Sequence, residues 1–101
     1  MEIKAEHYPD NSVITIEKNK LIGIEGEEFQ NLVQESLDKG SKTITINLSK
    51  VEYIASWGIG VLVHAYTTCT NKNVKFEIKN VSGNVMSILH QIKLDKLFNI
   101  N

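Results

Sequence analysis

Ser56 stands where a hydroxyl group could carry a regulatory function. It precedes Gly58 at the junction between a short loop and an apolar segment with helical character. The free backbone N–H groups of a helix gather at its N-terminus, so a hydroxyl there can cap the helix. A phosphate there would lie at the positive end of the helix dipole. The sequence therefore offers two roles for Ser56, a structural cap or a phosphorylation site.

Trp57, the only tryptophan of the chain, follows this serine directly. A tryptophan in that place either packs half-buried against the sheet or stands exposed as an anchor, because interface hot spots are enriched in tryptophan. Gly58 and Gly60 form a Gly-x-Gly pair with Val63 three residues on, which is not a dinucleotide-binding fingerprint. Their expected role is a close approach of backbone at the helix start.

The remaining candidates for catalysis or metal binding show no pattern typical of either. They are three histidines and one cysteine: His7, His64, His90 and Cys69. The histidines lack metal-ligand spacing with one another or with Cys69, which we expect to be an ordinary thiol. Because no nucleophile–base pair, metal cluster or phosphate loop can be assembled, we expect no enzymatic activity, no cofactor and no metal ion.

The composition is typical of one small globular domain, which we expect to span residues 1–101. Its 42% hydrophobic and 23% charged residues are ordinary, and the net charge is −1 with eleven lysines and no arginine. Nucleic-acid binding is therefore not expected. A single cysteine fits a reducing cytosol, the N-terminus has no signal-peptide pattern, and the apolar run Ile59–Ala65 is too short to span a bilayer. We expect a cytoplasmic protein that does not insert directly into membranes.

The first half of the chain predicts two strands and a helix. Turn residues at Pro9–Ser12 separate an edge strand, Glu2–His7, from a buried strand, Val13–Ile16, and favour a β-hairpin. A helix over Glu27–Lys39 is predicted by one apolar stripe: Phe29, Leu32, Val33, Ser36 and Leu37. Three carboxylates are expected to form its acidic start, with no catalytic role: Glu25, Glu27 and Glu28. Gly40 suits the position just after its end.

The second half predicts strands and helices in alternation. Thr43–Leu48 alternates as a strand, and a helix follows over Trp57–Thr70. The expected apolar face of this helix consists of Ile59, Leu62, Val63 and Tyr66. The next strand is marked by Val74, Phe76 and Ile78. Ser82 is the expected N-cap of a last helix, whose stripe is Val85, Met86, Ile88, Leu89 and Ile92. We expect Met86 and Phe98 in the core.

The element order is therefore strand, strand, helix, strand, helix, strand, helix, with a possible short strand at the end. Strand–helix–strand units imply right-handed crossovers and parallel strand pairs. Each helix has one apolar stripe and a polar back. The sequence predicts an α/β fold, a small mixed β-sheet with helices packed mainly on one side.

Two segments carry a resemblance to a known family. Asn47-Leu48-Ser49 ends a strand, and Ala55-Ser56-Trp57-Gly58-Ile59-Gly60 opens a helix. This arrangement resembles the STAS domain of bacterial anti-sigma factor antagonists, in which Asn/Asp-Leu-Ser is followed by Asp-Ser-Ser/Thr-Gly-Leu-Gly. The start of the last helix at Val81-Ser82 and the apolar tail Leu94–Ile100 are also similar. The resemblance implies a STAS-like fold over most of the chain.

The resemblance also implies a phosphorylation switch. In that family the first serine of the motif is phosphorylated by a partner that is both serine kinase and anti-sigma factor. The unphosphorylated form binds this partner and frees the sigma factor, and a phosphatase resets the phosphorylated form. Carried over, Ser56 is the phosphorylation site. The partner-binding residues are Ala55, Ser56, Trp57, Gly58 and Ile59, in a surface formed by Ala55–Leu62 and the loop Lys18–Gly26.

Three positions depart from the family pattern. The acidic residue before the serine is Ala55, the second hydroxyl residue is Trp57, and Lys20-Leu21-Ile22-Gly23 replaces a Gly-x-Leu-Asp motif. The loss of a carboxylate and the gain of a large ring beside Ser56 favour an alternative function. It is a STAS scaffold without a switch, or an accessory subunit, for example of a lipid transporter or a signalling complex.

Overall fold

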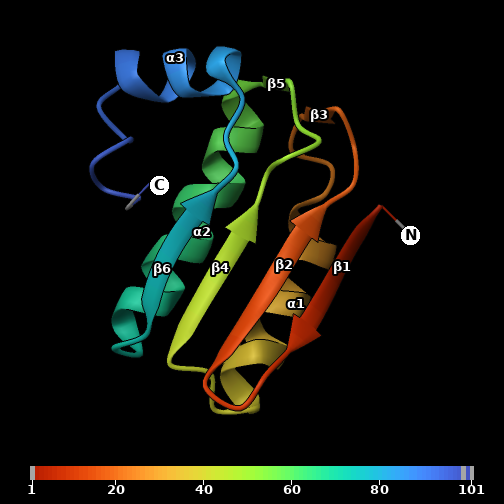
Figure 1. Cartoon of the computed structure of the whole chain (residues 1–101), viewed down its shortest axis with the longest axis vertical. Helices are drawn as coiled ribbons and strands as arrows, with labels where there is room; N and C mark the ends of the chain where they lie inside the picture. The colour runs from red at the N-terminus through yellow and green to blue at the C-terminus, as the bar shows by residue number, and fades with distance from the viewer. Residues whose placement is uncertain (1, 99, 101) are drawn as a thin grey trace.

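The fold is built on a mixed β-sheet. A computed structural model of the chain describes residues 2–98 and 100. Its main sheet has the strand order β1–β2–β4–β6 (Figure 1). The strands are, in chain order, β1 (Ile3–His7), β2 (Asn11–Ile16), β4 (Thr43–Asn47) and β6 (Lys75–Lys79). β1 and β2 pair antiparallel as the predicted hairpin, and β4 pairs in parallel with both β2 and β6. The prediction of a mixed sheet is thus confirmed.

The turn of the hairpin is shorter than the sequence suggests. The backbone N–H of Tyr8 donates to the carbonyl of Asn11 at 2.8 Å, so the chain reverses before Asn11. Asn11 and Ser12 then belong to β2, where they pair with Thr43 and Ile44 of β4. Pairing with a second neighbour holds these two turn-forming residues in an extended conformation, against their local preference.

The helices lie mainly on one side of the sheet, as predicted. α1 (Gly26–Asp38) and α2 (Ser56–Asn71) lie behind the strands in Figure 1, and α3 (Gly83–Gln91) lies beyond the end of the sheet, near the start of α2. The strand side chains facing α1 and α2 are apolar and buried, among them Ile14, Ile46 and Ile78. Ser82 is the N-cap of α3, since its Oγ accepts a hydrogen bond from the backbone N–H of Val85 at 3.2 Å.

The buried face of α2 differs from the predicted apolar face. Leu62 is fully buried, but the other three residues of the predicted face are only partly buried. The buried residues of the helix are mostly small: Gly58, Leu62, Ala65 and Cys69. α2 is apolar on most of its surface, so hydrophobicity alone could not identify the side on which small residues allow a close approach. Met86, expected in the core, is likewise only half-buried.

A second, two-residue strand pair was not predicted. β3 (Lys20–Leu21) pairs in parallel with β5 (Tyr53–Ile54) at the end of the sheet where α2 begins. Leu21 and Ile54 are buried, whereas Lys20 and Tyr53 are exposed. This pair joins the loop after β2 to the residues that lead into α2, and so brings two distant segments of the chain together.

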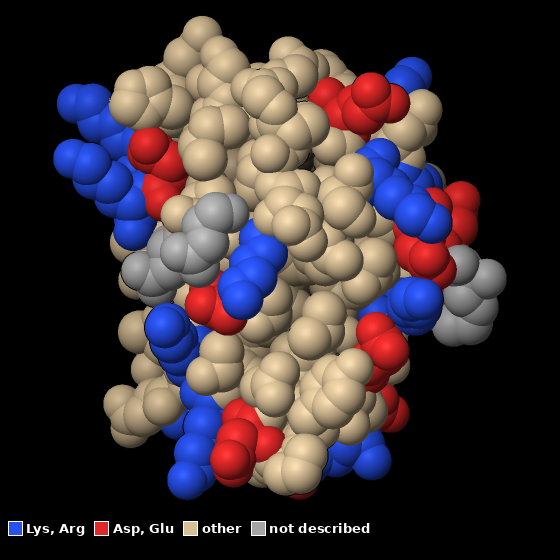
Figure 2. All heavy atoms as spheres, viewed as in Figure 1, with Lys and Arg blue, Asp and Glu red and all other residues tan. Residues whose placement is uncertain are grey.

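The C-terminal segment packs along β6. Phe98 is fully buried, and its ring lies 5.9 Å from that of Tyr66 and 5.7 Å from that of Phe76. Ile100 forms a parallel bridge with Ile78. Among the described residues, this isolated bridge stands in place of the short terminal strand considered from the sequence. Asn99 of the predicted apolar tail lies outside the described residues. Figure 2 shows the opposite, helix-free face of the sheet, on which lysine and acidic side chains are interspersed.

Candidate functional site

The start of α2 is fixed by backbone hydrogen bonds to the neighbouring loop. Ala55 is extended, with φ −90° and ψ 167°, and its N–H donates to the carbonyl of Leu21 at 2.9 Å. Its own carbonyl accepts the first helical hydrogen bond, from Ile59, at 2.9 Å. Ala55 is therefore the N-cap of α2, and it offers no side-chain cap. The capping role considered for Ser56 is wrong, because Ser56 is already the first residue of the helix.

Ser56 is an exposed residue in the first turn of α2. Its side chain is exposed and forms no hydrogen bond within residues 2–98 and 100. In the first turn of a helix the backbone N–H groups are also free of helical acceptors. A group added to the hydroxyl would thus project into solvent beside the positive end of the helix dipole.

Gly58 explains why α2 can begin so close to this loop. A Cβ built on Gly58 would lie 2.2 Å from the carbonyl oxygen of Leu21, a contact that side chains do not tolerate. Gly60 has no atom within 4 Å of the equivalent position. The close approach expected of the two glycines therefore holds for Gly58 and not for Gly60.

The loop between β3 and α1 is organised by Glu25. The carboxylate of Glu25 accepts hydrogen bonds from the backbone N–H of Gly23 at 2.8 Å and of Ile22 at 3.2 Å. It also accepts a hydrogen bond from the ammonium group of Lys18. The side chain of Glu25 is 3% exposed and that of Lys18 is 15% exposed. Glu25 is therefore a buried loop anchor as well as the residue at the start of α1, where it was expected to be only part of an acidic cluster.

The charge state of this pair follows from its contacts. Burial alone would raise the pKa of Glu25, but the hydrogen bond from Lys18, helped by the N–H of Gly23, outweighs it and lowers the pKa below its usual value. The hydrogen bond to Glu25 raises the pKa of Lys18, against the effect of burial. Both groups are charged at neutral pH. Nothing in the local sequence pattern identified the pair, because its members lie seven positions apart with a short strand between them.

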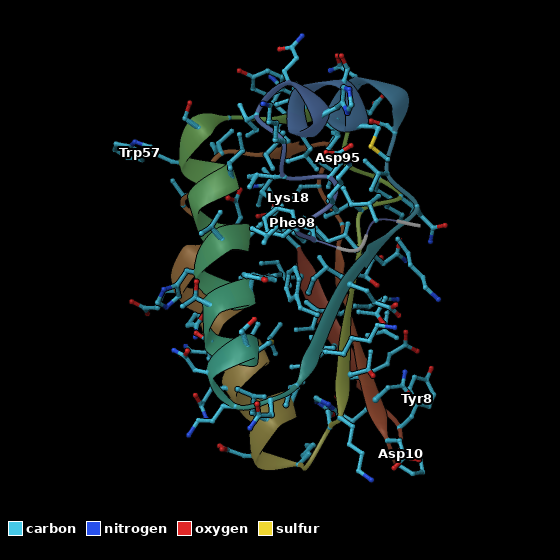
Figure 3. The ribbon with its side chains drawn as sticks, turned by 90° about the vertical axis from the view of Figure 1, so that its left-hand side faces the viewer. Tyr8, Asp10, Lys18, Trp57, Asp95 and Phe98 are labelled. Carbon is cyan, nitrogen blue, oxygen red and sulfur yellow. The ribbon has the colours of Figure 1, made fainter. Side chains whose placement is uncertain are left out.

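The loop and the start of α2 expose a group of apolar side chains. Trp57 is 78% exposed, Ile24 is 76% exposed and Ile22 is 38% exposed. Gly23, with φ +114°, lies against Trp57, because a Cβ built on Gly23 would lie 2.5 Å from the Cβ of Trp57. We call Ile22, Ile24 and Trp57 the Trp57 patch. Figure 3 shows Trp57 projecting away from the start of α2, whereas Lys18 lies within the molecule.

The structure thus brings together the two segments that the sequence singled out, the loop after β2 and the start of α2. Of the five candidate residues in Ala55–Ile59, Ser56 and Trp57 are exposed, Ala55 and Ile59 are half-buried, and Gly58 is buried. Of the two positions considered for Trp57, the exposed one is correct.

A serine–histidine pair, which the sequence did not predict, lies at the other end of the sheet. The Oγ of Ser12 lies 2.8 Å from Nδ1 of His7, whose Nε2 lies 2.9 Å from the carboxylate of Glu35. The expectation that no nucleophile–base pair could be assembled was therefore wrong. However, Ser12 is fully buried and also hydrogen-bonds Ser41 at 2.7 Å, so no substrate reaches its hydroxyl. The network joins the hairpin, α1 and the start of β4.

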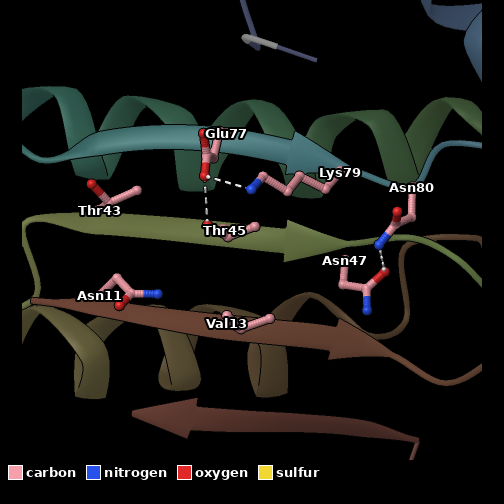
Figure 4. A pocket seen from close by; sticks show the side chains of 8 residues that line it. All are labelled: Asn11, Val13, Thr43, Thr45, Asn47, Glu77, Lys79 and Asn80. Carbon is pink, nitrogen blue, oxygen red and sulfur yellow. Dashed lines mark hydrogen bonds and ion pairs between the residues drawn. The ribbon is translucent and has the colours of Figure 1, made fainter. Parts of the chain in front are cut away.

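A shallow polar trough of about 350 Å³ lies on the helix-free face of the sheet (Figure 4). Its polar side chains bond one another, since Thr45 donates to Glu77 at 2.9 Å and Asn80 donates to Asn47 at 3.1 Å. Lys79 also lies 3.8 Å from Glu77. Five of the lining side chains are thus engaged with one another rather than directed at a ligand.

His90 and Cys69 are two further residues with reactive side chains, the first exposed and the second buried. Among the residues described, no cluster of three or more His, Cys, Asp or Glu could hold a metal ion. His90 pairs with Asp95 at 2.8 Å near the surface, and this hydrogen bond lowers the pKa of Asp95. Cys69 is fully buried, and burial raises its pKa to about 11. Within the same residues, no helix combines the length and apolar character that crossing a membrane requires.

The fold and this site define a small α/β module with an exposed helix start and an apolar patch, features suited to protein contact. The model of the STAS domain family matches residues 2–101, and the chain belongs to that family. A search of curated proteins found no match.

Solved structures with this fold come from several protein classes. A candidate anti-sigma factor antagonist from Thermotoga maritima is 26% identical, with a TM-score of 0.78 over 97% of this chain and 84% of that one. The phosphorylated form of the Bacillus cell fate determinant SpoIIAA is 15% identical, with a TM-score of 0.73 over 98% and 90%. A sulfate transporter family protein from Wolinella succinogenes is 10% identical, with a TM-score of 0.81 over 94% and 79%. The two structures of low identity show a shared fold alone.

Proposed function

We propose that this STAS domain is a cytoplasmic, non-enzymatic regulator that resembles anti-sigma factor antagonists. It binds a serine-kinase anti-sigma factor, and phosphorylation of Ser56 weakens that binding until a phosphatase removes the phosphate. The surface that makes contact consists of Ala55–Ile59 with the loop residues Ile22 and Ile24. Gly58 contributes by permitting the close backbone approach rather than by touching the partner.

The observation that carries the proposal is the position of Ser56. Its hydroxyl is exposed, has no hydrogen bond among the described residues, and adjoins an exposed tryptophan. Phosphoryl transfer would form a bond between Ser56 Oγ and the γ-phosphorus of ATP, release ADP and pass the hydroxyl proton to a base of the kinase. Hydrolysis by a phosphatase would return the hydroxyl and inorganic phosphate.

The phosphate has enough effect to act as a switch. It adds about −1.5 to −2 charges at pH 7. Burying it in an interface without a compensating cation costs several kcal/mol. Lys18, the cation that holds the adjacent loop, is already bonded to Glu25. A penalty of about 4 kcal/mol would weaken binding roughly a thousandfold.

The experiment is phosphorylation by a purified serine kinase of the anti-sigma class, with ATP, followed by mapping of the phosphosite by mass spectrometry. We expect phosphate on Ser56 and none in the Ser56→Ala variant. Ser87, an exposed serine on α3, supplies a matched control, because Ser87→Ala should be phosphorylated like the wild type. Absence of phosphate on Ser56, together with equal binding by Ser56→Asp and the wild type, would exclude the switch.

A second candidate is a STAS scaffold or accessory subunit without a switch, for example of a lipid transporter or signalling complex. The replacement of the family's acidic and hydroxyl residues by Ala55 and the exposed Trp57 favours it. In this case the Trp57 patch supplies the binding energy, and the phosphorylation state of Ser56 does not affect binding. Trp57→Ala would then abolish binding that Ser56→Asp leaves intact, whereas under the switch Ser56→Asp also weakens binding.

A further inference from the structure

We infer that the buried Lys18–Glu25 ion pair positions the Trp57 patch against the start of α2. Lys18 and Glu25 are positioning residues for the proposed binding surface. The link to a partner rests on the proposed function, whereas the positioning itself is a property of the free protein.

The ion pair ties together both ends of the loop that carries Ile22 and Ile24. Lys18 comes two residues after the end of β2, and Glu25 stands at the start of α1. The segment between them contains β3, Ile22 and Ile24. The contact between the two side chains therefore closes the loop at its base. The second carboxylate oxygen of Glu25 holds the loop from inside, through the N–H groups of Ile22 and Gly23.

The same loop is in direct contact with α2. Gly23 lies against the Cβ of Trp57, and the carbonyl of Leu21 accepts the N–H of Ala55. A displacement of Gly23 would thus change the surroundings of the Trp57 side chain and separate it from Ile22 and Ile24. The bonding to Glu25 fixes a glycine with φ +114°, a conformation that the unfolded loop has no reason to prefer over others.

Stability alone is a weak explanation for this pair. A buried ion pair costs desolvation energy, and well-packed apolar residues of similar volume often stabilise a protein as much or more. What apolar residues could not supply is an acceptor for two backbone N–H groups at fixed angles. Directional contacts of this kind specify one loop conformation.

The test compares Glu25→Gln with Glu28→Gln in the free protein. Glutamine keeps the size of Glu25 but removes its charge, and its single amide oxygen can accept from Lys18 or from the N–H groups of Ile22 and Gly23, but not from both sides. Glu28 is an exposed carboxylate in the first turn of the same helix and serves as the matched control. NMR hydrogen exchange is measured at the amides of Ile22 and Gly23 and, for the core, at Ile44 and Ile46 of β4. The indole N–H signal of Trp57 reports on the patch.

In Glu25→Gln we expect exchange at Ile22 and Gly23 to rise about tenfold or more. We also expect a displaced Trp57 indole signal and a clearly smaller rise in exchange at Ile44 and Ile46. Glu28→Gln should match the wild type at every position. Lys18→Met, which retains an apolar stem but no cation, should shift the same signals in the same direction, and carries the test if Glu25→Gln does not fold.

Two outcomes would overturn the inference. One is wild-type exchange at Ile22 and Gly23 with an unmoved indole signal. The other is an equal rise in exchange at the loop and at β4, which would mean that the pair stabilises the whole fold. Neither measurement involves a kinase, so a failure to phosphorylate Ser56 would reject the proposed function and leave the positioning result standing.

Discussion

Gly58 of α2 packs directly on the backbone of Leu21, so that a Cβ on Gly58 would lie 2.2 Å from the Leu21 carbonyl oxygen. The same carbonyl accepts a hydrogen bond from the N–H of Ala55. The backbone of Leu21 therefore contacts both the residue before α2 and the first turn of α2. The proposed binding surface depends on this approach, because a longer separation would move Ile22 and Ile24 away from Ser56 and Trp57.

The Gly58 contact predicts opposite effects for two neighbouring glycines. Gly58→Ala should lower the free energy of unfolding by about 3 kcal/mol, because backbone has to move to admit the methyl group. Gly60→Ala should raise it by about 0.5–1 kcal/mol, since the site is open and alanine favours the helix. Urea denaturation monitored by circular dichroism measures both. Equal stability of the two variants would show that α2 can shift away from Leu21 at little cost.

Patterns with a regular period predicted most of the fold. The stripe of Phe29, Val33 and Ser36 placed α1 correctly, and all three are buried. Ser82 identified the start of α3 through local capping chemistry. These signals are confined to a few turns of one element, which is why sequence alone was sufficient for them.

The parts that were missed depend on contacts between distant residues. β3 and β5 have two residues each, too few to show alternation, and each exists because it pairs with the other. The role of Glu25 depends on Lys18, which approaches it only after the loop has folded. Ser56 was assigned correctly to the start of α2. Its expected capping role was wrong by one position, since Ala55 is the N-cap.

The buried hydroxyl of Ser12 provides a second stability prediction. Ser12→Ala should destabilise the protein by about 1–3 kcal/mol, because it removes the hydrogen-bond partner of Ser41 and of Nδ1 of His7 in a buried place. Ser87→Ala, at an exposed position of α3, should change stability by less than about 0.5 kcal/mol. The midpoints of urea denaturation give the comparison. Coincident midpoints for the two variants would mean that a neighbouring group replaces the lost hydroxyl.

Cys69 should be chemically inert in the folded protein. It is fully buried, and with a pKa of about 11 only about one molecule in ten thousand carries the reactive thiolate at pH 7. Iodoacetamide at neutral pH should leave the native protein unlabelled and should label it fully in urea, as mass spectrometry of the intact chain can show. Rapid labelling without denaturant would require local opening between α2 and the sheet.

Acid should weaken the loop anchor through Glu25. The lowered pKa of this carboxyl means that its contribution to stability is present above the unfolded pKa, about 4.3 for a glutamate, and is lost as the pH falls through the folded pKa. The facing groups are Lys18, whose raised pKa keeps it protonated throughout this range, and Glu2, which lies 3.7 Å from Lys18. The difference in unfolding free energy between the wild type and Glu25→Gln should therefore be largest near neutral pH and shrink below about pH 4. Urea denaturation at several pH values measures this difference, with Glu28→Gln as the control for an exposed carboxylate. A difference that stays constant down to pH 3 would mean that the carboxylate of Glu25 does not stabilise the fold through its charge.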